Sequence, residues 1–137
     1  MIYLLDTHAL WHHASDGDGL SPRAAFCLDE APLKDLCILD ISLYELARHM
    51  AVGRIEVDDP ERTLITLQNS YPILRSNAII AWKSASLDWP KRNAKGQHLD
   101  PADRAIVAAA MLQKLTIVTA DKEMHAFGPT AGVPLLW

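Results

Sequence analysis

The sequence predicts an α/β fold in which helices flank a central, mainly parallel sheet. Short apolar runs, rich in leucine and β-branched residues, alternate with segments that carry helix-start signals, and this alternation is typical of parallel sheets. The chain has 137 residues and half of them are hydrophobic, so it can bury a core but is too short to divide. We therefore expect one domain that covers residues 1–137 and holds the whole functional site.

Residues 2–5 form the first predicted strand, because they are apolar throughout, as in a strand buried on both faces. The strand ends at Asp6, and a helix is expected to follow through His13. Ser21 and Pro22 then supply an N-cap and a proline at the first helical position, which open a second helix.

The second predicted strand covers residues 36–41 and leads into a third helix. Ser42 and Glu45 have the spacing of a capping box, in which the two side chains satisfy free N–H groups at a helix start. This pattern predicts that Glu45 lies in the first helical turn and that Gly53 ends the helix.

The middle of the chain predicts two helices, a short strand and a long loop. Asp59 and Pro60 start the first of these helices, residues 72–74 form the strand, and residues 77–87 form the other helix. Residues 89–99 contain proline, glycine and several charges, so we expect a solvent-facing loop there that can act as a mobile flap.

The C-terminal part carries the same kinds of signal. Asp100 and Pro101 provide a capping aspartate and a proline at the first helical position, so a helix is expected to about Lys114. Residues 115–119 then predict a β-branched strand, and residues 133–136 an edge strand.

Composition excludes several classes of protein. Cys27 and Cys37 lie too far apart for a Cys-x-x-Cys redox or zinc pair and are expected to be reduced packing residues. Asp6 interrupts the apolar N-terminus before a signal-peptide core can form. The longest uncharged helical run, residues 105–112, is far shorter than the roughly 20 residues that cross a bilayer. We therefore expect a cytoplasmic protein that does not enter the membrane.

Four acids occupy related local positions: Asp6 and Asp121 follow predicted strands, and Glu45 and Asp103 lie in first helical turns. Ligands of open parallel sheets bind beyond the carboxyl ends of the strands, beside the helix N-termini. Four carboxylates gathered there would repel one another and raise each other's pKa, so a cation is expected among them. Oxygen ligands without a cysteine cluster favour one or two Mg²⁺ or Mn²⁺ ions, which suit phosphodiester cleavage. With a net charge of −4, the protein would have to capture a polynucleotide locally.

Each of these acids also fits a purely structural role. Glu45 and Asp103 match helix-start patterns, and Asp6 and Asp121 can cap the helices that follow them. Only their joint placement favours a functional site. Asp100 is assigned to helix capping alone.

The motifs LLDTHAL, SLYELA, LDPADRAIVAAA, LTIVTAD and GVPLLW resemble, in order and spacing, those of the PIN-domain family, and particularly VapC-type toxins of bacterial toxin–antitoxin pairs. The resemblance covers almost the whole chain. It implies a PIN-like three-layer α/β/α fold, endonucleolytic cleavage of RNA that depends on Mg²⁺ or Mn²⁺, homodimerisation, and inhibition by a VapB-like antitoxin.

The resemblance also implies residue roles. The four catalytic, metal-binding acids would be Asp6, Glu45, Asp103 and Asp121. Thr119 resembles the hydroxyl residue that supports the last acid, and Thr7 and Arg104 are further supporting candidates, Arg104 by pairing with an acid. Arg48 and His49 replace the Ile-Lys pattern that the family commonly shows.

RNA contacts are expected from basic residues near these motifs: Arg48, Arg54 and His98. The two arginines also fit solvated positions near a helix end, and His98 fits ordinary loop hydrogen bonding. His8 and His12 have the i, i+4 spacing of a metal pair, but a surface or interface role is favoured. Among the tryptophans, Trp89 is the candidate for stacking on a base.

Two other functions compete. A haloacid-dehalogenase-like phosphatase also starts with an aspartate after the first strand, but it needs a second aspartate two residues later, where this chain has His8. A non-catalytic PIN-like module that binds RNA or a partner stays open as the alternative.

Overall fold

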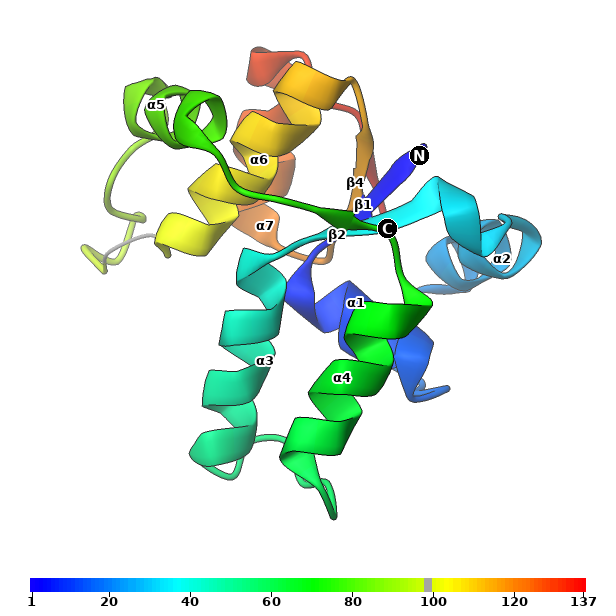
Figure 1. Ribbon diagram of the computed structural model, residues 1–137. Coiled ribbons are helices and arrows are strands. Elements are labelled where there is room, and N and C mark those ends of the chain that lie inside the picture. Colours follow the sequence, from blue (N-terminus) through cyan, green and yellow to red (C-terminus); the bar gives the residue numbers. More distant parts are fainter. Residues whose placement is uncertain (98–99) are drawn as a thin grey trace.

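The structure, a computed structural model, describes residues 1–97 and 100–137 and has the expected α/β architecture (Figure 1). The strands of its sheet pair in parallel in the order β3-β2-β1-β4-β5. Their bounds are Tyr3–Leu5 for β1, Leu36–Leu39 for β2, Ile73–Leu74 for β3, Thr116–Val118 for β4 and Leu135–Leu136 for β5.

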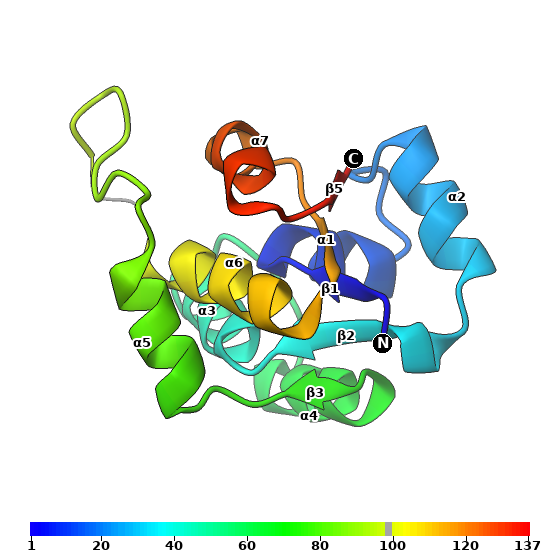
Figure 2. The same cartoon turned by 90° about the horizontal axis from the view of Figure 1, so that it is seen from above.

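Helices cover both faces of the sheet, which confirms the three-layer α/β/α fold (Figure 2). One face is covered by α1 (Thr7–Ala14), α2 (Pro22–Glu30), α3 (Ile41–Ala51) and α4 (Pro60–Ser70). The other is covered by α5 (Ala78–Ser86), α6 (Pro101–Gln113) and α7 (Lys122–Phe127). Short 3₁₀ helices occupy Leu33–Asp35 and Gly128–Ala131.

The central strands are buried on both faces, as their unbroken apolar sequences predict. Leu4 pairs in register with Cys37 and Ile117, and all three belong to the core under α6. The next residue, Leu5, pairs with Ile38 and belongs to the core under α1 and α3. Full burial of one such leucine or isoleucine contributes about 1.5–3 kcal/mol. The strands are therefore held in a register that brings their carboxyl ends to one edge.

The start of α3 differs from the expected capping box. The helix begins at Ile41, because β2 ends at Leu39 and the chain turns at once. Asp40 occupies the N-cap position without a side-chain cap bond, since its carboxylate accepts the backbone N–H of Ser76. Ser42 thus lies inside the helix, buried, and its Oγ has no partner among the described residues. The prediction that Ser42 caps the helix was wrong, and Glu45 lies in the second turn rather than the first.

The other helix starts follow their sequence signals. Ser21, Asp59 and Asp100 each accept a backbone N–H in the first turn of the helix that they precede. Cys27 and Cys37 are free thiols. No helix within residues 1–97 and 100–137 combines the length and the apolar character needed to cross a membrane.

Candidate active site

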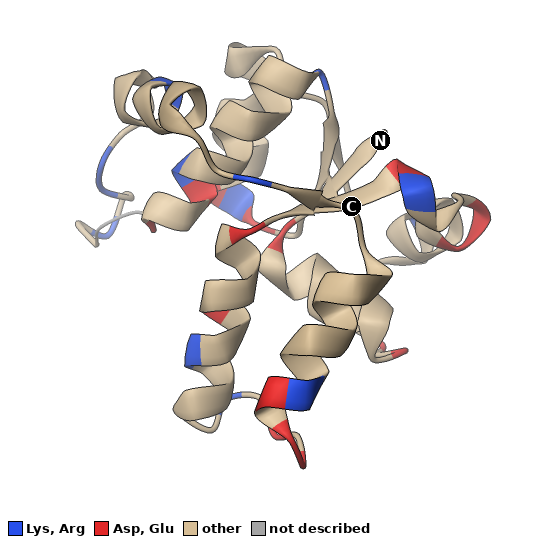
Figure 3. Ribbon diagram, viewed as in Figure 1, with Lys and Arg blue, Asp and Glu red and all other residues tan. Residues whose placement is uncertain are grey.

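A cavity of about 330 Å³ opens at the carboxyl edge of the sheet. Its lining residues come from the ends of β1 and β4 and from α1, α3 and the start of α6: Asp6, Thr7, His8, Glu45, Arg48, His49, Asp100, Asp103, Ala120 and Asp121. The four acids that the sequence singled out therefore share one cavity, although far-apart segments of the chain carry them. Figure 3 shows red acidic segments on α3, near the start of α6 and just after β1.

Two of these acids are joined through one buried hydroxyl group. Asp6 caps α1 by accepting the N–H of Ala9 at 2.7 Å, and it also accepts the hydroxyl of Thr119. The same Thr119 oxygen accepts the N–H of Asp121 at 3.0 Å. Asp121 in turn caps α7 by accepting the N–H of Met124 at 2.8 Å. Thr119 thus fixes the end of β1 relative to the start of α7.

The third acid is held by another buried hydroxyl group. Thr7, only 4% exposed, donates its hydroxyl to Oε2 of Glu45 across the contact between α1 and α3. Since a carboxylate can accept at about four lone-pair positions, this bond leaves Glu45 free to bind a further group.

The fourth acid, Asp103, lies in the first turn of α6. Burial raises its pKa to about 8, and repulsion from Asp121, Glu45 and the neighbouring acids adds to the effect. Burial also raises the pKa of Asp6 and of Glu45, against the opposing effect of their hydroxyl hydrogen bonds. These carboxyl groups therefore resist ionising together without a cation beside them.

Asp100 is a further acid of this cavity that the sequence analysis assigned to capping alone. Its Oδ1 does cap α6, accepting the N–H of Ala102 at 3.0 Å. It also lines the cavity, and its charge raises the pKa of Glu45 and Asp103. The i, i+3 spacing of Asp100 and Asp103 at a helix start was the available signal, because it puts both side chains on one side of the helix.

Basic and imidazole groups form the rim of the cavity. Arg48 lies 3.4 Å from Oδ2 of Asp100, and the rings of His8 and His49 lie 5.8 Å apart. Burial, together with the charges of His8 and the nearby arginines, lowers the pKa of His49. His12 lies elsewhere, with its ring against the Gly17–Gly19 turn, so His8 and His12 do not form a metal pair.

Two of the sequence-based assignments need correction. Arg104 does not pair with an acid: it donates to the backbone oxygens of Trp89 at 2.6 Å and Leu87 at 3.0 Å, because those carbonyls follow α5 and need donors. Trp89 cannot stack on a base, since it is 4% exposed and stacks on Phe127 with ring centroids 5.1 Å apart.

The remaining candidates lie outside the cavity. Arg54 follows α3 and does not line it, although its charge contributes to the lowered pKa of His49. His98, the third candidate for RNA contact, lies outside the described residues.

The chemistry of the donors fits a hard divalent cation, because the acids offer only oxygen ligands and because burial raises the pKa of Asp103 and Asp6, so that both resist carrying a charge without a cation beside them. Within the described residues, however, no group of three or more histidine, cysteine, aspartate or glutamate side chains is already spaced to bind one ion. Mg²⁺ usually keeps several waters and takes only one or two carboxylates directly, so the two observations agree.

Comparison with known proteins gives one family and a set of solved structures. The sequence model of the PIN domain matches residues 3–128. FitAcB from Neisseria gonorrhoeae is 21% identical, with a TM-score of 0.68 over 99% of this chain and 97% of that chain. A toxin-antitoxin complex from Klebsiella pneumoniae is 23% identical, with a TM-score of 0.64 over 98% of this chain and 96% of that chain.

A third solved structure is that of Mycobacterium tuberculosis VapC20, described as a Sarcin-Ricin loop cleaving toxin. It is 14% identical, with a TM-score of 0.63 over 92% of this chain and 95% of that chain. At such identities the likeness establishes a common fold. No curated protein is similar enough in sequence to count as a match.

Proposed function

Because the chain belongs to the PIN-domain family, we propose that it is a divalent-metal-dependent endoribonuclease and the toxin of a toxin–antitoxin pair. The observation that carries this proposal is the meeting of four carboxylates from separate segments in one cavity. A solved structure of the same fold is described as a Sarcin-Ricin loop cleaving toxin, which supports RNA as the substrate. The proposed reaction is hydrolysis of a phosphodiester bond.

Asp6, Glu45, Asp103 and Asp121 would hold one or two Mg²⁺ or Mn²⁺ ions, in part through water. Such ions lower the pKa of a bound water and neutralise charge on the phosphate oxygens. The protein's own contribution is to keep the carboxylates in place before substrate arrives. Thr119 does this for Asp6 and for the start of α7, and Thr7 does it for Glu45.

The first experiment is RNA cleavage by protein purified free of any antitoxin. With Mg²⁺ or Mn²⁺ we expect shorter products with defined ends, and excess chelator should abolish them. Asp6→Asn should reduce the cleavage rate at least a hundredfold, because it removes a charge from the cavity and unbalances the Thr119 bonds. The matched control is Asp29→Asn on the exposed side of α2, which should cleave like the wild type.

The outcomes separate the two candidate functions. Cleavage that persists in excess chelator contradicts a metal-dependent nuclease. Retarded migration of RNA without any new ends would favour the alternative, a non-catalytic PIN-like binding module. Circular dichroism spectra of the Asp6 and Asp29 variants check that loss of cleavage is not loss of fold.

We further propose that an antitoxin protein inhibits this nuclease and that the chain forms a homodimer. A solved toxin-antitoxin complex with the same fold supports the first of these. A groove of about 660 Å³ between α3 and α4, lined in part by Leu43, Leu64 and Ile65, offers apolar surface to such a partner. Exposed apolar side chains on α5 support the proposed homodimer.

A further inference from the structure

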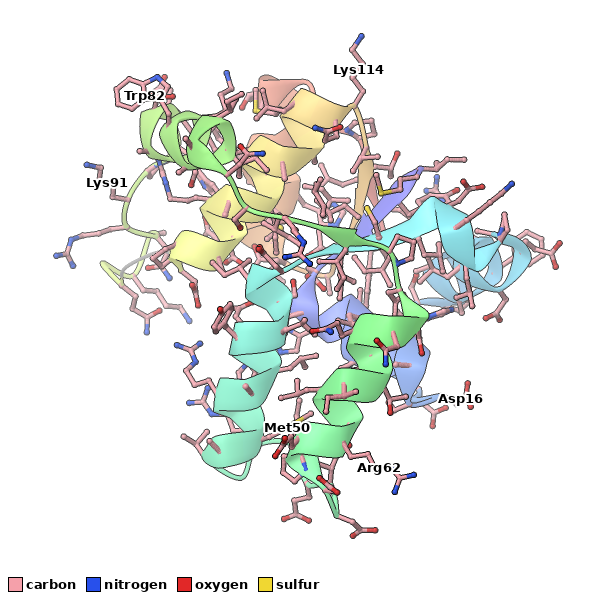
Figure 4. The ribbon with its side chains drawn as sticks, viewed as in Figure 1. Asp16, Met50, Arg62, Trp82, Lys91 and Lys114 are labelled. Atoms are coloured by element: carbon pink, nitrogen blue, oxygen red, sulfur yellow. The ribbon has the colours of Figure 1, made fainter. Side chains whose placement is uncertain are left out.

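Three cations cluster in the loop between α5 and α6, between Asp88 and Asp100, in a protein whose net charge is −4. Residues 90–97 contain Lys91, Arg92 and Lys95 and no acid, and all three cations are exposed. Figure 3 shows the blue stretches of this loop, and Figure 4 shows Lys91 directed away from the body of the protein. We propose that the basic loop, residues 90–97, binds the phosphate backbone of the RNA strand beside the carboxylate cavity. The proposal rests on the proposed function.

The basic loop is already folded in the free protein. Oδ1 of Asn93 accepts the backbone N–H groups of Lys95 and Gln97, both at 3.0 Å, and Gly96 takes the positive φ of +77° that the turn needs. Arg92 donates one guanidinium N–H to the carbonyl of Gly96 at 2.9 Å and keeps other donors free. The cations are thus presented on an ordered turn, which lowers the entropic cost of binding a polyanion.

The base of the loop is anchored to the helices that carry two of the acids. Trp89 is packed against Phe127, at the end of α7, and its carbonyl accepts a hydrogen bond from Arg104. Arg104 directly follows Asp103 in α6, and Asp121 is the N-cap of α7. One end of the loop is therefore tied to the helices next to the cavity.

A second group of cations lies on the neighbouring helix. Arg48 of α3 is 60% exposed and approaches Asp100 at the cavity rim, and α3 packs against α6 there. Arg54 follows the same helix. In Figure 1 the loop and α3 approach the start of α6 from two different sides, so the basic loop and Arg48 put positive charge on both of them. An RNA strand that crosses the cavity can contact both.

These observations favour RNA over an acidic protein segment as the ligand of the loop. A nuclease of net charge −4 gains no long-range attraction for RNA from its overall charge, so its affinity depends on local cations next to the site. The basic loop supplies three of them at the start of the helix that carries Asp103.

The test compares triple variants that lose the same charge. The first replaces Lys91, Arg92 and Lys95 by glutamine, and the control replaces the exposed cations Arg23, Lys34 and Lys114 by glutamine. The probe is a fluorescein-labelled 20-nucleotide single-stranded RNA, with fluorescence anisotropy measured in chelator at several salt concentrations. For the loop variant we expect affinity about tenfold lower at low salt and a salt-dependence slope smaller by about 2. The control should stay within about twofold of wild type, because its cations lie away from the RNA path.

A double variant guards against disturbance of the turn. Replacing Lys91 and Lys95 by glutamine leaves the Arg92 bond to Gly96 intact, and about two thirds of the change in slope should remain. Equal RNA affinities for the loop variant and the control variant would overturn the proposal. Loop-dependent binding of poly-L-glutamate without loop-dependent binding of RNA would overturn it too, in favour of an acidic protein partner.

A separate assay tests whether the protein is a nuclease at all. Hydrolysis of bis(p-nitrophenyl) phosphate by the wild-type protein with Mn²⁺ reports on the carboxylate cavity alone, because this small diester does not reach the loop. A wild-type protein that cleaves neither the diester nor RNA argues against a nuclease. The anisotropy comparison still decides whether the loop binds RNA.

Discussion

Asp103 shows how burial and neighbouring charge act on a single residue. Its pKa in the folded, metal-free protein is raised to about 8, so the folded state binds a proton that the unfolded chain releases near pH 4. This proton stabilises the fold fully below about pH 4, and the stabilisation is lost as the pH rises towards 8.

We therefore predict that Asp103→Asn melts a few degrees above wild type at pH 8 in chelator, because asparagine cannot ionise. At pH 4 the difference should be small. Thermal unfolding of both proteins in chelator across this range is the measurement. If the melting temperatures of the two proteins differed by the same amount at every pH, Asp103 would ionise in the folded protein as it does in the unfolded chain, and the prediction would be wrong.

Thr119 tests the role of the buried hydroxyl groups. Thr119→Val keeps the shape of the side chain but leaves Asp6 and the N–H of Asp121 without this partner. We predict a loss of about 10- to 100-fold in Mn²⁺ affinity and in RNA cleavage, as is typical when a group that orients metal ligands is removed. Thr119→Ser retains the hydroxyl and should recover most of both. Equal losses in the two variants would indicate a packing effect instead.

At the scale of elements, Arg104 links α6 to the segment that follows α5. Its two hydrogen bonds to backbone carbonyls are largely shielded from water, since the residue is 8% exposed. We predict that Arg104→Gln lowers the free energy of unfolding by about 1–3 kcal/mol, because the carbonyls of Trp89 and Leu87 lose their donors. The stability of Arg104→Lys should lie between those of the wild type and the glutamine variant, because an ammonium group lacks the planar fork that reaches both oxygens. Denaturant unfolding measures both, and wild-type stability in the glutamine variant would contradict this role.

The elements also show how far sequence patterns reach. The strands were predictable because a run such as residues 2–5 has apolar side chains on both faces, and only burial on both faces tolerates that. The prediction of a capping box at Ser42 was wrong because this pattern reflects only neighbouring residues. The start of the helix is instead set by the hydrogen bond between Asp40 and Ser76, which lie 36 residues apart. The prediction that Arg104 pairs with an acid was wrong for a related reason. Its neighbour Asp103 suggested an acid partner, but the carbonyls near Trp89 become neighbours only in the fold.

At the scale of the whole molecule, the parallel sheet explains why the candidate site was largely predictable. Residues directly after β1 and β4 must emerge at one edge because these strands are neighbours and run in the same direction. Topology therefore brings Asp6 and Asp121 to the same edge, and the Thr119 hydroxyl group fixes their positions there. Asp100 adds to the negative charge of the cavity only because α3 comes close to the start of α6. Core packing sets that distance, and no sequence motif records it.

The last prediction concerns assembly. Ile79 and Trp82 lie three residues apart on one side of α5 and are 68% and 75% exposed, and Figure 4 shows Trp82 at the outer surface. Exposed apolar side chains that share one helix face favour association, so we expect this face to contribute to the proposed homodimer. Sedimentation of the wild-type protein should give twice the monomer mass, and Trp82→Ser should shift the equilibrium to monomer by at least tenfold in Kd. Phe26→Ser is the matched control, because Phe26 is also 68% exposed but lies on α2. A monomeric wild-type protein, or equal weakening by both variants, would remove α5 from the interface.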